Sequence, residues 1–435
     1  MTATAEHSTP TGASARGAGP ATASAAGTSA GPAPLAEFLG TVLRGLRALP
    51  PLDLELASAY GNVLAEDVAT KAPLPAFDHA ALDGYAARYE DLVASPGRPV
   101  RLRVVGDLGA ASWRPVRLTP GTCFCVAAGA PLPATADVVV PATDTDQGMA
   151  AVEIHHAPKK GYGIRRAGQQ LPEDAVLARA GSVVTPAMVA AFAASGIGRV
   201  VVRPSPRVAV LSTGDELVEA GRISQPGQVV DVNSYALTAA AAEAGAQAYR
   251  VGICDDDPEA LRGLLADQTL RADAIVTTGG TGTGPGDMVR RVLTRRSVVF
   301  TELSVYPCAT LGFGTLGGEE VPVICLPGDP GAALVGFEIL ARPVIQVLAG
   351  AEPVFRPSAR AHLLETVNSP AGLREFRPAA VAERRGGGYT VQPLPGGPYT
   401  LSGLAACNGL MVLGERVTTA AAGSTVDVLL LDRKR

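Results

Sequence analysis

Residues 207–348 alternate apolar strands with loops and helices, and this rhythm constrains the fold more than any other feature of the sequence. Three segments each contain an apolar run: R-V-A-V-L-S-T-G (207–214), A-D-A-I-V-T-T-G-G (272–280) and V-P-V-I-C-L-P-G (321–328). Continuous runs of this kind are typical of strands buried on both faces of a parallel sheet. Helical patterns lie between them, and another covers 331–348. We therefore predict a doubly wound, mostly parallel sheet covered by helices.

The sequence on either side of this unit differs in texture, which indicates further domains. At 435 residues the chain exceeds what one hydrophobic core usually supports. Its first part is almost entirely Ala, Gly, Ser, Thr and Pro, a composition that predicts disorder. The last part is β-rich and predicts a small barrel or sandwich. The predicted division is a disordered tail (1–33), a linker domain (34–71 with 156–205), a mostly-β insertion (72–155), the α/β domain (206–350) and a C-terminal β domain (351–435).

Charge and cysteine content argue against several classes of protein. A formal charge of −4 gives no basic surface of the kind that usually binds nucleic acid. The six Cys form no C-x-x-C pair, which argues against a disulfide framework and fits a reducing cytoplasm. Cys123 and Cys125 share one face of a predicted strand, and we interpret them as small buried apolar residues rather than as ligands. The chain has no uninterrupted apolar run of about 18 residues, so we predict no membrane span.

Three loops of the α/β unit follow buried strands, where the ligand crevice of an open α/β sheet lies. They are L-S-T-G-D-E-L (211–217), T-T-G-G-T-G-T-G-P-G-D (277–287) and L-P-G-D-P-G-A-A (326–333). Small residues let backbone N–H groups approach an anion, and threonine hydroxyls add donors, so the middle loop predicts a phosphate site; the alternative is a flexible connection. The predicted ligand-binding residues are Thr213, Gly214, Thr278, Gly279, Gly280, Thr281, Gly282, Thr283, Pro327, Gly328 and Asp329.

Carboxylates after the same strands suggest a divalent cation. Asp215, Glu216, Asp256 and Asp287 each follow a strand and could converge on one rim. Carboxylates beside a bound phosphate would repel it unless a hard cation lay between them, which suggests Mg²⁺. Each can also be a helix N-cap or a solvated surface residue, and D-D-D-P (255–258) is a plausible capping sequence. We predict Glu216, Asp256 and Asp287 as the metal ligands.

Six motifs together carry a resemblance to a known family. They are P-L-P-A-F-D-H-A-A-L-D-G-Y-A (73–86), S-T-G-D-E-L (212–217), G-Q-V-V-D-V-N-S (227–234), D-D-P-E-A-L (256–261), T-T-G-G-T-G (277–282) and L-P-G-D-P (326–330). In this order they resemble the molybdopterin molybdenumtransferases, the MoeA and gephyrin E-domain family. The resemblance runs from about residue 35 to the C-terminus.

The resemblance implies a MogA/MoaB-like α/β domain combined with a β-rich insertion, an elongated linker domain and a C-terminal β-barrel. It implies a cytoplasmic homodimer that hydrolyses adenylylated molybdopterin with Mg²⁺, releasing AMP while molybdate is inserted. By this likeness Asp256 matches an acidic position of the family, and we expect Asp83, Glu216 and Asp287 to be catalytic. The segment that bears Asp83 would come from the partner subunit, so the active cleft would be shared.

The chain departs from the family pattern at several polar positions. Ala128 stands where a Thr is usual, and Gln169 and Gln170 replace Glu and Asp. The segment 306–314 contains no Lys, and Asp329 stands where Asn is usual. Fewer cations and an added carboxylate predict weaker binding of molybdate and pterin phosphate, because each charge-assisted contact contributes about 1.5–3 kcal/mol.

These departures leave two alternatives open. A non-catalytic or repurposed scaffold would keep the framework and bind a pterin, a nucleotide or a protein partner. The loop 279–282 with Asp287 also resembles the molybdopterin adenylyltransferases, which suggests adenylyl transfer as a further alternative. Four nearby arginines can replace part of the missing positive charge, or can be ordinary surface residues: Arg290, Arg291, Arg295 and Arg296.

Overall fold

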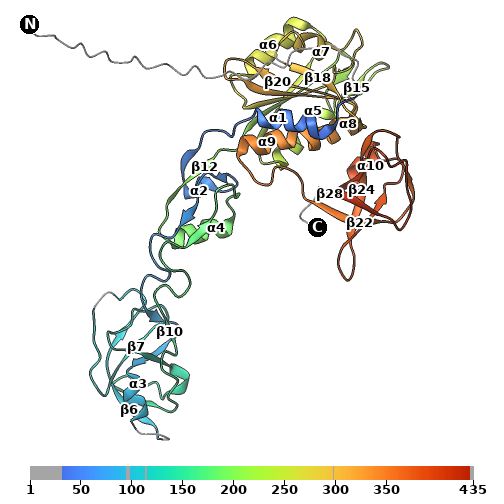
Figure 1. Ribbon diagram of the computed structural model, residues 1–435. Coiled ribbons are helices and arrows are strands. Elements are labelled where there is room, and N and C mark those ends of the chain that lie inside the picture. The colour runs from blue at the N-terminus through green and yellow to red at the C-terminus, as the bar shows by residue number, and fades with distance from the viewer. Residues whose placement is uncertain (1–31, 95–97, 113–114, 297, 432–435) are drawn as a thin grey trace, which may run out of the picture. The chain divides into compact units, whose positions relative to one another are not determined.

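The computed structural model describes residues 32–94, 98–112, 115–296 and 298–431 (Figure 1). Almost all of the predicted disordered tail, residues 1–33, lies outside these residues. The chain forms two compact units, which we describe separately. Of the described residues, unit 1 contains those up to Arg47, with 206–348 and those from Pro353 onward, and unit 2 contains those within 48–205 with 349–352.

The core of unit 1 is a six-stranded sheet with strand order β16-β13-β17-β21-β20-β18. The first four strands are parallel, which confirms the predicted mostly parallel α/β domain. The sequence did not reveal that β20 and β18 extend the sheet as antiparallel strands. The strands are β13 (Arg207–Thr213), β16 (Gln247–Cys254), β17 (Ala274–Thr278), β18 (Val298–Glu302), β20 (Thr310–Leu316) and β21 (Val321–Leu326).

Helices cover both faces of this sheet (Figure 1). Ala209 and Leu211 of β13 pack in one apolar cluster with Leu261 and Val289, whereas Val208 and Val210 are buried outside that cluster. Such burial on both faces requires the unbroken apolar runs seen in the sequence. The cluster lies under α6 (Pro258–Gln268) and α7 (Met288–Leu293); the other face carries α5 (Asn233–Glu243), α8 (Pro330–Gly336), a π-helical turn (Phe337–Ala341) and α9 (Arg342–Ala349).

The last three elements form one apolar helix, Pro330–Ala349, which is long enough to cross a membrane. Most of its length is buried inside the protein, as expected of a core helix. Among the described residues it is the one helix that passes this test, so the structure gives no clear membrane span.

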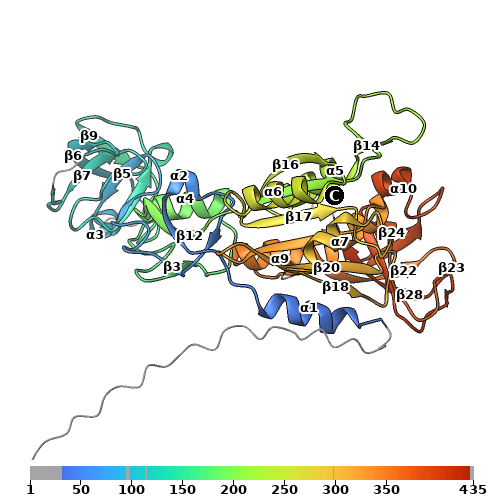
Figure 2. The same cartoon turned by 90° about the horizontal axis from the view of Figure 1, so that it is seen from above.

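Helix α1 (Leu35–Arg44) also belongs to unit 1. Ala33 pairs with Leu303 in a parallel bridge, and its N–H donates to the Glu302 carbonyl at 2.8 Å, so α1 starts beside the edge strand β18 (Figure 2). Its apolar side buries Leu35 and Leu39. This placement differs from the predicted division, which put residues 34–71 in the linker domain.

The C-terminal part of unit 1 is a closed β-barrel, because β24 pairs with both β25 and β26. Val391, Met411 and Val428 fill its interior. The barrel predicted from the resemblance is therefore confirmed. Its strands are β22 (Ser358–Leu363), β24 (Arg374–Glu383), β25 (Tyr389–Pro393), β26 (Gly409–Leu413) and β28 (Thr425–Leu430), accompanied by α10 (Leu401–Ala406), by β23 (Val367–Asn368) paired with β27 (Thr419–Ala420), and by β19 (Val305–Tyr306) paired with β24.

Unit 2 contains two groups of strands. One packs around Phe192 and includes α4 (Pro186–Ala194), which is followed by Gly196 at φ +73°, a conformation that often ends a helix. The other is a five-stranded sheet in which Cys123 is buried, as interpreted from the sequence, and burial raises the pKa of its thiol to about 12. The first group also includes β1 (Leu52–Glu55), α2 (Leu56–Ala59), β2 (Val63–Leu64), β3 (Val68–Ala69), β11 (Val176–Ala178) and β12 (Arg199–Arg203). The second contains β5 (Gly84–Ala87), β6 (Val100–Leu108), β7 (Thr122–Val126), β8 (Val138–Pro141) and β9 (Ala151–Ile154), with α3 (Tyr89–Val93) and the pair β4 (His79–Ala80) and β10 (Ile164–Arg165) nearby.

A buried ion pair joins the α/β domain to the barrel within unit 1. Arg356 donates through Nε and Nη2 to the two carboxylate oxygens of Glu338 at 2.9 and 3.0 Å. The two side chains are only 8% and 11% exposed. Arg356 also donates to the Leu431 carbonyl at 2.7 Å. This bidentate contact fixes the connection between the apolar helix and the first barrel strand.

We predict that Arg356→Met lowers the free energy of unfolding by about 3 kcal/mol, because it leaves the Glu338 carboxylate buried without its main partner. Arg360→Met is the matched control, since Arg360 and its partner Asp427 are 70% and 64% exposed and such pairs contribute about 1 kcal/mol or less. Urea unfolding followed by circular dichroism compares the two. Equal destabilisation by both substitutions would contradict a structural role for the buried pair.

Candidate functional site

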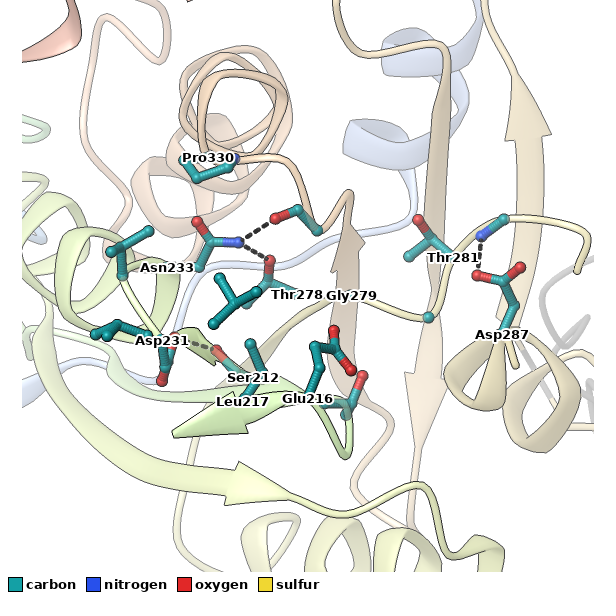
Figure 3. A pocket seen from close by; sticks show the side chains of 17 residues that line it. Ser212, Glu216, Leu217, Asp231, Asn233, Thr278, Gly279, Thr281, Asp287 and Pro330 are labelled. Carbon is teal, nitrogen blue, oxygen red and sulfur yellow. Dashed lines mark hydrogen bonds between the residues drawn. The ribbon is translucent and has the colours of Figure 1, made fainter. Parts of the chain in front are cut away.

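The strands β13, β17 and β21 end at a cavity of about 310 Å³ in unit 1 (Figure 3). Loops after these strands supply most of the wall, as predicted from the strand order. Four predicted ligand-binding residues do not line this cavity: Gly214, Thr283, Pro327 and Asp329. The predicted residues that do line it are Thr213, Thr278, Gly279, Gly280, Thr281, Gly282 and Gly328.

Two glycines let the loop after β17 fold tightly against β13. Gly279 and Gly280 have φ values of +93° and +62°, which favour glycine. A Cβ atom on Gly279 would lie only 2.6 Å from the Thr213 carbonyl oxygen. The Thr213 hydroxyl in the cavity wall is buried and has no hydrogen-bond partner in the described parts of the chain. Leaving such a group unpaired costs about 1–3 kcal/mol, so the cavity is suited to a ligand that pairs with it.

Asn233, at the start of α5, ties the strand ends together. Its side-chain amide donates to Thr278 Oγ1 at 2.9 Å and to the Gly328 carbonyl at 2.8 Å (Figure 3). Thr278 Oγ1 in turn donates to the Pro327 carbonyl at 2.8 Å. The amide therefore fixes the loop after β17 against the loop after β21. Asn233 was not among the predicted site residues, although it lies in the motif 227–234.

Asp231 is a second residue that the sequence prediction missed. Its carboxylate is 2% exposed and accepts hydrogen bonds from Ser212 Oγ at 2.8 Å and from the Ser234 N–H at 3.0 Å. The Ser234 hydroxyl also donates to it, and Arg250 lies 3.6 Å away. With these partners the Asp231 charge is used to hold β13 against α5. The adjacent short pair β14 (Leu217–Val218) and β15 (Val229–Val230) completes this side of the cavity.

Glu216 and Asp287, both predicted as catalytic, line the same cavity. The Asp287 carboxylate accepts hydrogen bonds from the N–H groups of Gly282 at 2.8 Å and Gly284 at 2.6 Å, so it closes its own loop. Glu216 folds back over Gly214, where a Cβ atom would lie 2.5 Å from the Glu216 carboxylate. Gly214 therefore allows the position of Glu216, although it does not itself line the cavity.

Asp256 lies beside this cavity wall rather than in it. Its backbone N–H donates to Asp215 Oδ1 at 2.8 Å. Burial raises the pKa of the Asp256 carboxyl, and the negative charges of Asp215 and Glu216 raise this pKa further. Within the residues that the structure describes, no three His, Cys, Asp or Glu side chains are grouped closely enough to hold a metal ion. The three predicted ligands Glu216, Asp256 and Asp287 thus do not form one preassembled cluster.

Asp329 has a different role from the one predicted. It is the N-cap of α8, and its Oδ2 accepts a hydrogen bond from the Ala332 N–H at 2.9 Å. Because Asp and Asn cap helices about equally well, the change from the family's Asn preserves this role. Asp329 does not line the cavity, and direct binding of the ligand by its side chain stays a prediction.

The remaining predicted residue, Asp83, belongs to unit 2. Its Oδ1 accepts a hydrogen bond from the Ala128 N–H at 2.7 Å. The backbone at position 128 thus holds this carboxylate although the side-chain hydroxyl usual in the family is absent. Gln169 Oε1 accepts from the Arg166 N–H at 3.0 Å, and Arg166 pairs with Asp78 at 2.5 Å.

A second cavity of about 400 Å³ adjoins the first, and the two share Gly282 and Asp287 in their walls. Thr283, predicted as a ligand-binding residue, lines this second cavity. Arg296 does not line it. The arginines that line it are Arg262, Arg290, Arg291 and Arg295.

Family models match all three parts of the chain. The model of a probable molybdopterin binding domain covers residues 209–347 and therefore includes the loops of the first cavity. The MoeA N-terminal region (domain I and II) covers residues 33–196, and the MoeA C-terminal region (domain IV) covers residues 360–431. The fold and the site thus define a modular protein of the MoeA type, built around a molybdopterin-binding domain.

Individual relatives narrow this class. The chain is 37% identical over 404 residues to molybdopterin molybdenumtransferase 1 of Mycobacterium tuberculosis, covering 88% of this chain and 95% of the relative. It is 33% identical over 398 residues to the molybdopterin molybdenumtransferase of Nostoc, covering 87% and 88%. The crystal structure of a molybdopterin biosynthesis MoeA protein from Pyrococcus horikosii matches with a TM-score of 0.79 and 28% identity, covering 92% and 99%. The chain belongs to the molybdopterin molybdenumtransferase family, as the six motifs indicated.

We predict that Gly279→Ala lowers the free energy of unfolding by about 2 kcal/mol or more, because alanine would be strained at this positive φ and would meet the Thr213 carbonyl. Gly286→Ala, in the same loop, is the matched control, since an added Cβ there meets nothing within 4 Å. Thermal unfolding of both variants provides the measurement. If the Gly279→Ala protein were as stable as the control, the close contact between this loop and the end of β13 would be contradicted.

Proposed function

We propose that the protein acts in molybdenum cofactor biosynthesis as a molybdopterin molybdenumtransferase, which inserts molybdenum from molybdate into molybdopterin. The observation that carries this proposal is the cavity at the ends of β13, β17 and β21, with its glycine–threonine wall and its buried unpaired hydroxyl. It lies within the domain matched by the molybdopterin-binding model. The family membership of the whole chain supplies the reaction class.

The loop after β17 offers donors for a phosphate group of the substrate. The N–H groups of Gly280 and Thr281 have no acceptor among the described residues, and Thr213 adds its hydroxyl. Three donors in the wall of one cavity suit the oxygens of a phosphate, and charge-assisted hydrogen bonds to an anion are about twice as strong as neutral ones. Asn233 keeps the strand ends in register while these donors hold the substrate.

We propose Mg²⁺ as the metal, held by Glu216 and Asp287 with Asp256 nearby. Mg²⁺ usually keeps several waters and takes one or two carboxylates together with substrate phosphates, so it does not need a preassembled three-ligand cluster. Burial raises the pKa of Asp256, and the negative charges of Asp215 and Glu216 raise it further, so a cation beside these carboxylates would be favourable. When bound, the ion would polarise a phosphoryl oxygen. Glu216 and Asp287 would then orient the adenylyl phosphate for hydrolysis, with release of AMP from adenylylated molybdopterin.

We further propose that the protein is a cytoplasmic homodimer in which Asp83 reaches the cavity of the partner subunit. The Ala128 N–H holds the Asp83 carboxylate in place, which supports a positioned rather than a solvated group. The alternative is a scaffold without turnover, favoured by the loss of the side-chain hydroxyl at Ala128 and of carboxylates at Gln169 and Gln170. Adenylyl transfer is distinguished by incorporation of AMP from ATP.

We predict that the wild-type gene restores molybdoenzyme activity in a bacterial strain that lacks its own molybdenumtransferase, and that Glu216→Gln reduces the restored activity about 10- to 100-fold. The reason is the loss of a charged contact of about 1.5–3 kcal/mol. Glu365→Gln, an exposed position in the barrel, is the control and should restore activity fully. No restoration by the wild-type gene, even at high molybdate, would refute transfer and favour the scaffold.

Removing the charge of Asp256 is expected to have two opposite effects on the thermal stability of the protein, one without and one with Mg²⁺. Because the folded-state pKa of Asp256 is raised, its ionised carboxylate destabilises the fold at neutral pH, and this penalty disappears as the pH falls through that pKa. Asp256→Asn should therefore raise the Tm of the metal-free protein at pH 7 while reducing the further increase that Mg²⁺ gives. Asp267→Asn, at an exposed position of α6 whose charge is not among those that raise the pKa of Asp256, should change neither value. An equal response of both variants to Mg²⁺ would rule out Asp256 as part of the metal site.

A further inference from the structure

The second cavity carries an excess of positive charge, although one of its arginines, Arg262, is paired with Glu259 of the same helix. Its charged lining side chains are four arginines and one carboxylate, Asp287. Arg262 comes from α6, and the other three come from α7 and the turn that follows it. The single carboxylate is already hydrogen-bonded to the N–H groups of Gly282 and Gly284, which partly offset its charge. The cavity is therefore suited to an anion.

Two of these arginines are held in place, while most of their N–H donors have no acceptor among the described residues. Arg290 Nη1 donates to the Thr281 carbonyl at 3.3 Å, and its guanidinium carbon lies 5.4 Å from the centre of the Phe300 ring. Arg291 Nη1 donates to the Pro285 carbonyl at 2.8 Å. A guanidinium has five N–H donors, so these contacts orient each group without exhausting it. Oriented guanidinium groups match the paired oxygens of a tetrahedral oxyanion better than a mobile ammonium does.

The position of this cavity connects it to the proposed reaction. Gly282 and Asp287 line both cavities. The arginine-lined cavity therefore adjoins the end of the loop after β17, which is the loop proposed to hold the substrate phosphate. We propose that the arginine-lined cavity is a second subsite, which binds a tetrahedral oxyanion beside the molybdopterin cavity. This inference rests on the proposed function, and two oxyanions of that reaction have the required chemistry: free molybdate and the phosphate of the AMP portion.

The test uses the full-length protein and measures binding of molybdate and of AMP separately by isothermal titration calorimetry. The variant Arg291→Gln/Arg295→Gln removes two charges from the cavity while keeping hydrogen-bonding side chains. We expect it to weaken binding of one of the two ligands by at least about tenfold, as expected for lost charge-assisted contacts. Arg296→Gln is the matched control, because Arg296 is an exposed residue next to Arg295 that does not line the cavity. Circular dichroism and thermal unfolding confirm that the variants are folded.

The outcomes separate the two oxyanions and the competing explanations. Weaker molybdate binding with unchanged AMP binding identifies a molybdate subsite, and the reverse identifies a nucleotide phosphate subsite. Unchanged binding of both ligands by the double variant, an equal loss in Arg296→Gln, or no binding of either ligand to the wild type would overturn the proposal. The proposed function is tested independently by restoration of molybdoenzyme activity, so an active protein without an arginine-dependent oxyanion site would refute this inference alone.

Discussion

The site depends on one backbone contact, the approach of Gly279 to the Thr213 carbonyl. Without a side chain on Gly279, the loop after β17 can turn directly across the end of β13. That turn places Thr278 where Asn233 can bridge it to Gly328. It also leaves the Thr213 hydroxyl buried and unpaired among the described residues. The unpaired Thr213 hydroxyl in the cavity wall therefore carries a small energetic cost, which a ligand that pairs with it can remove.

The carboxylates near the cavity differ in the neighbouring groups that compensate their negative charge. Asp231 is surrounded by Ser212, Ser234 and Arg250, so its charge stabilises the fold. Asp287 receives two loop N–H groups, which leave only part of its charge for a ligand. Asp256 has acidic neighbours instead, and its pKa is raised first by burial and then by the charges of Asp215 and Glu216. The capacity to attract a cation thus lies mainly at the Glu216 and Asp256 side of the cavity.

The sequence predicted the parts of the structure that depend on local pattern. Apolar runs identified the three strands β13, β17 and β21, because almost all of their residues are buried. The antiparallel strands β18 and β20 escaped prediction because β18 has a single buried residue and the apolar pattern of β20 is interrupted by Gly312 and Gly314. The amphipathic pattern of α1 indicates that one side of this helix is buried. The bridge between Ala33 and Leu303 determines where in the structure the helix lies.

The candidate site shows the same limit. The glycine–threonine loop was recognisable because few functions other than close approach to a ligand or a tight turn require that composition. Asp231 and Asn233 were overlooked because a buried polar residue is recognised by its partners, and these come from distant strands. Asp329 was assigned to the ligand because an N-cap and an anion-site residue look alike in a sequence. Residue type alone does not separate these roles; hydrogen-bond partners do.

The two adjoining cavities have opposite charge, and this difference has a chemical consequence. The first contains Glu216 and Asp287, and its described lining residues include no arginine or lysine, so a phosphate there is favoured when a cation accompanies it. The second is rich in guanidinium groups and favours an oxyanion without a metal. Because only Gly282 and Asp287 are common to both walls, two anions that would repel each other in water can be held as neighbours. Holding two reactants next to each other in this way reduces the entropic cost of bringing them together.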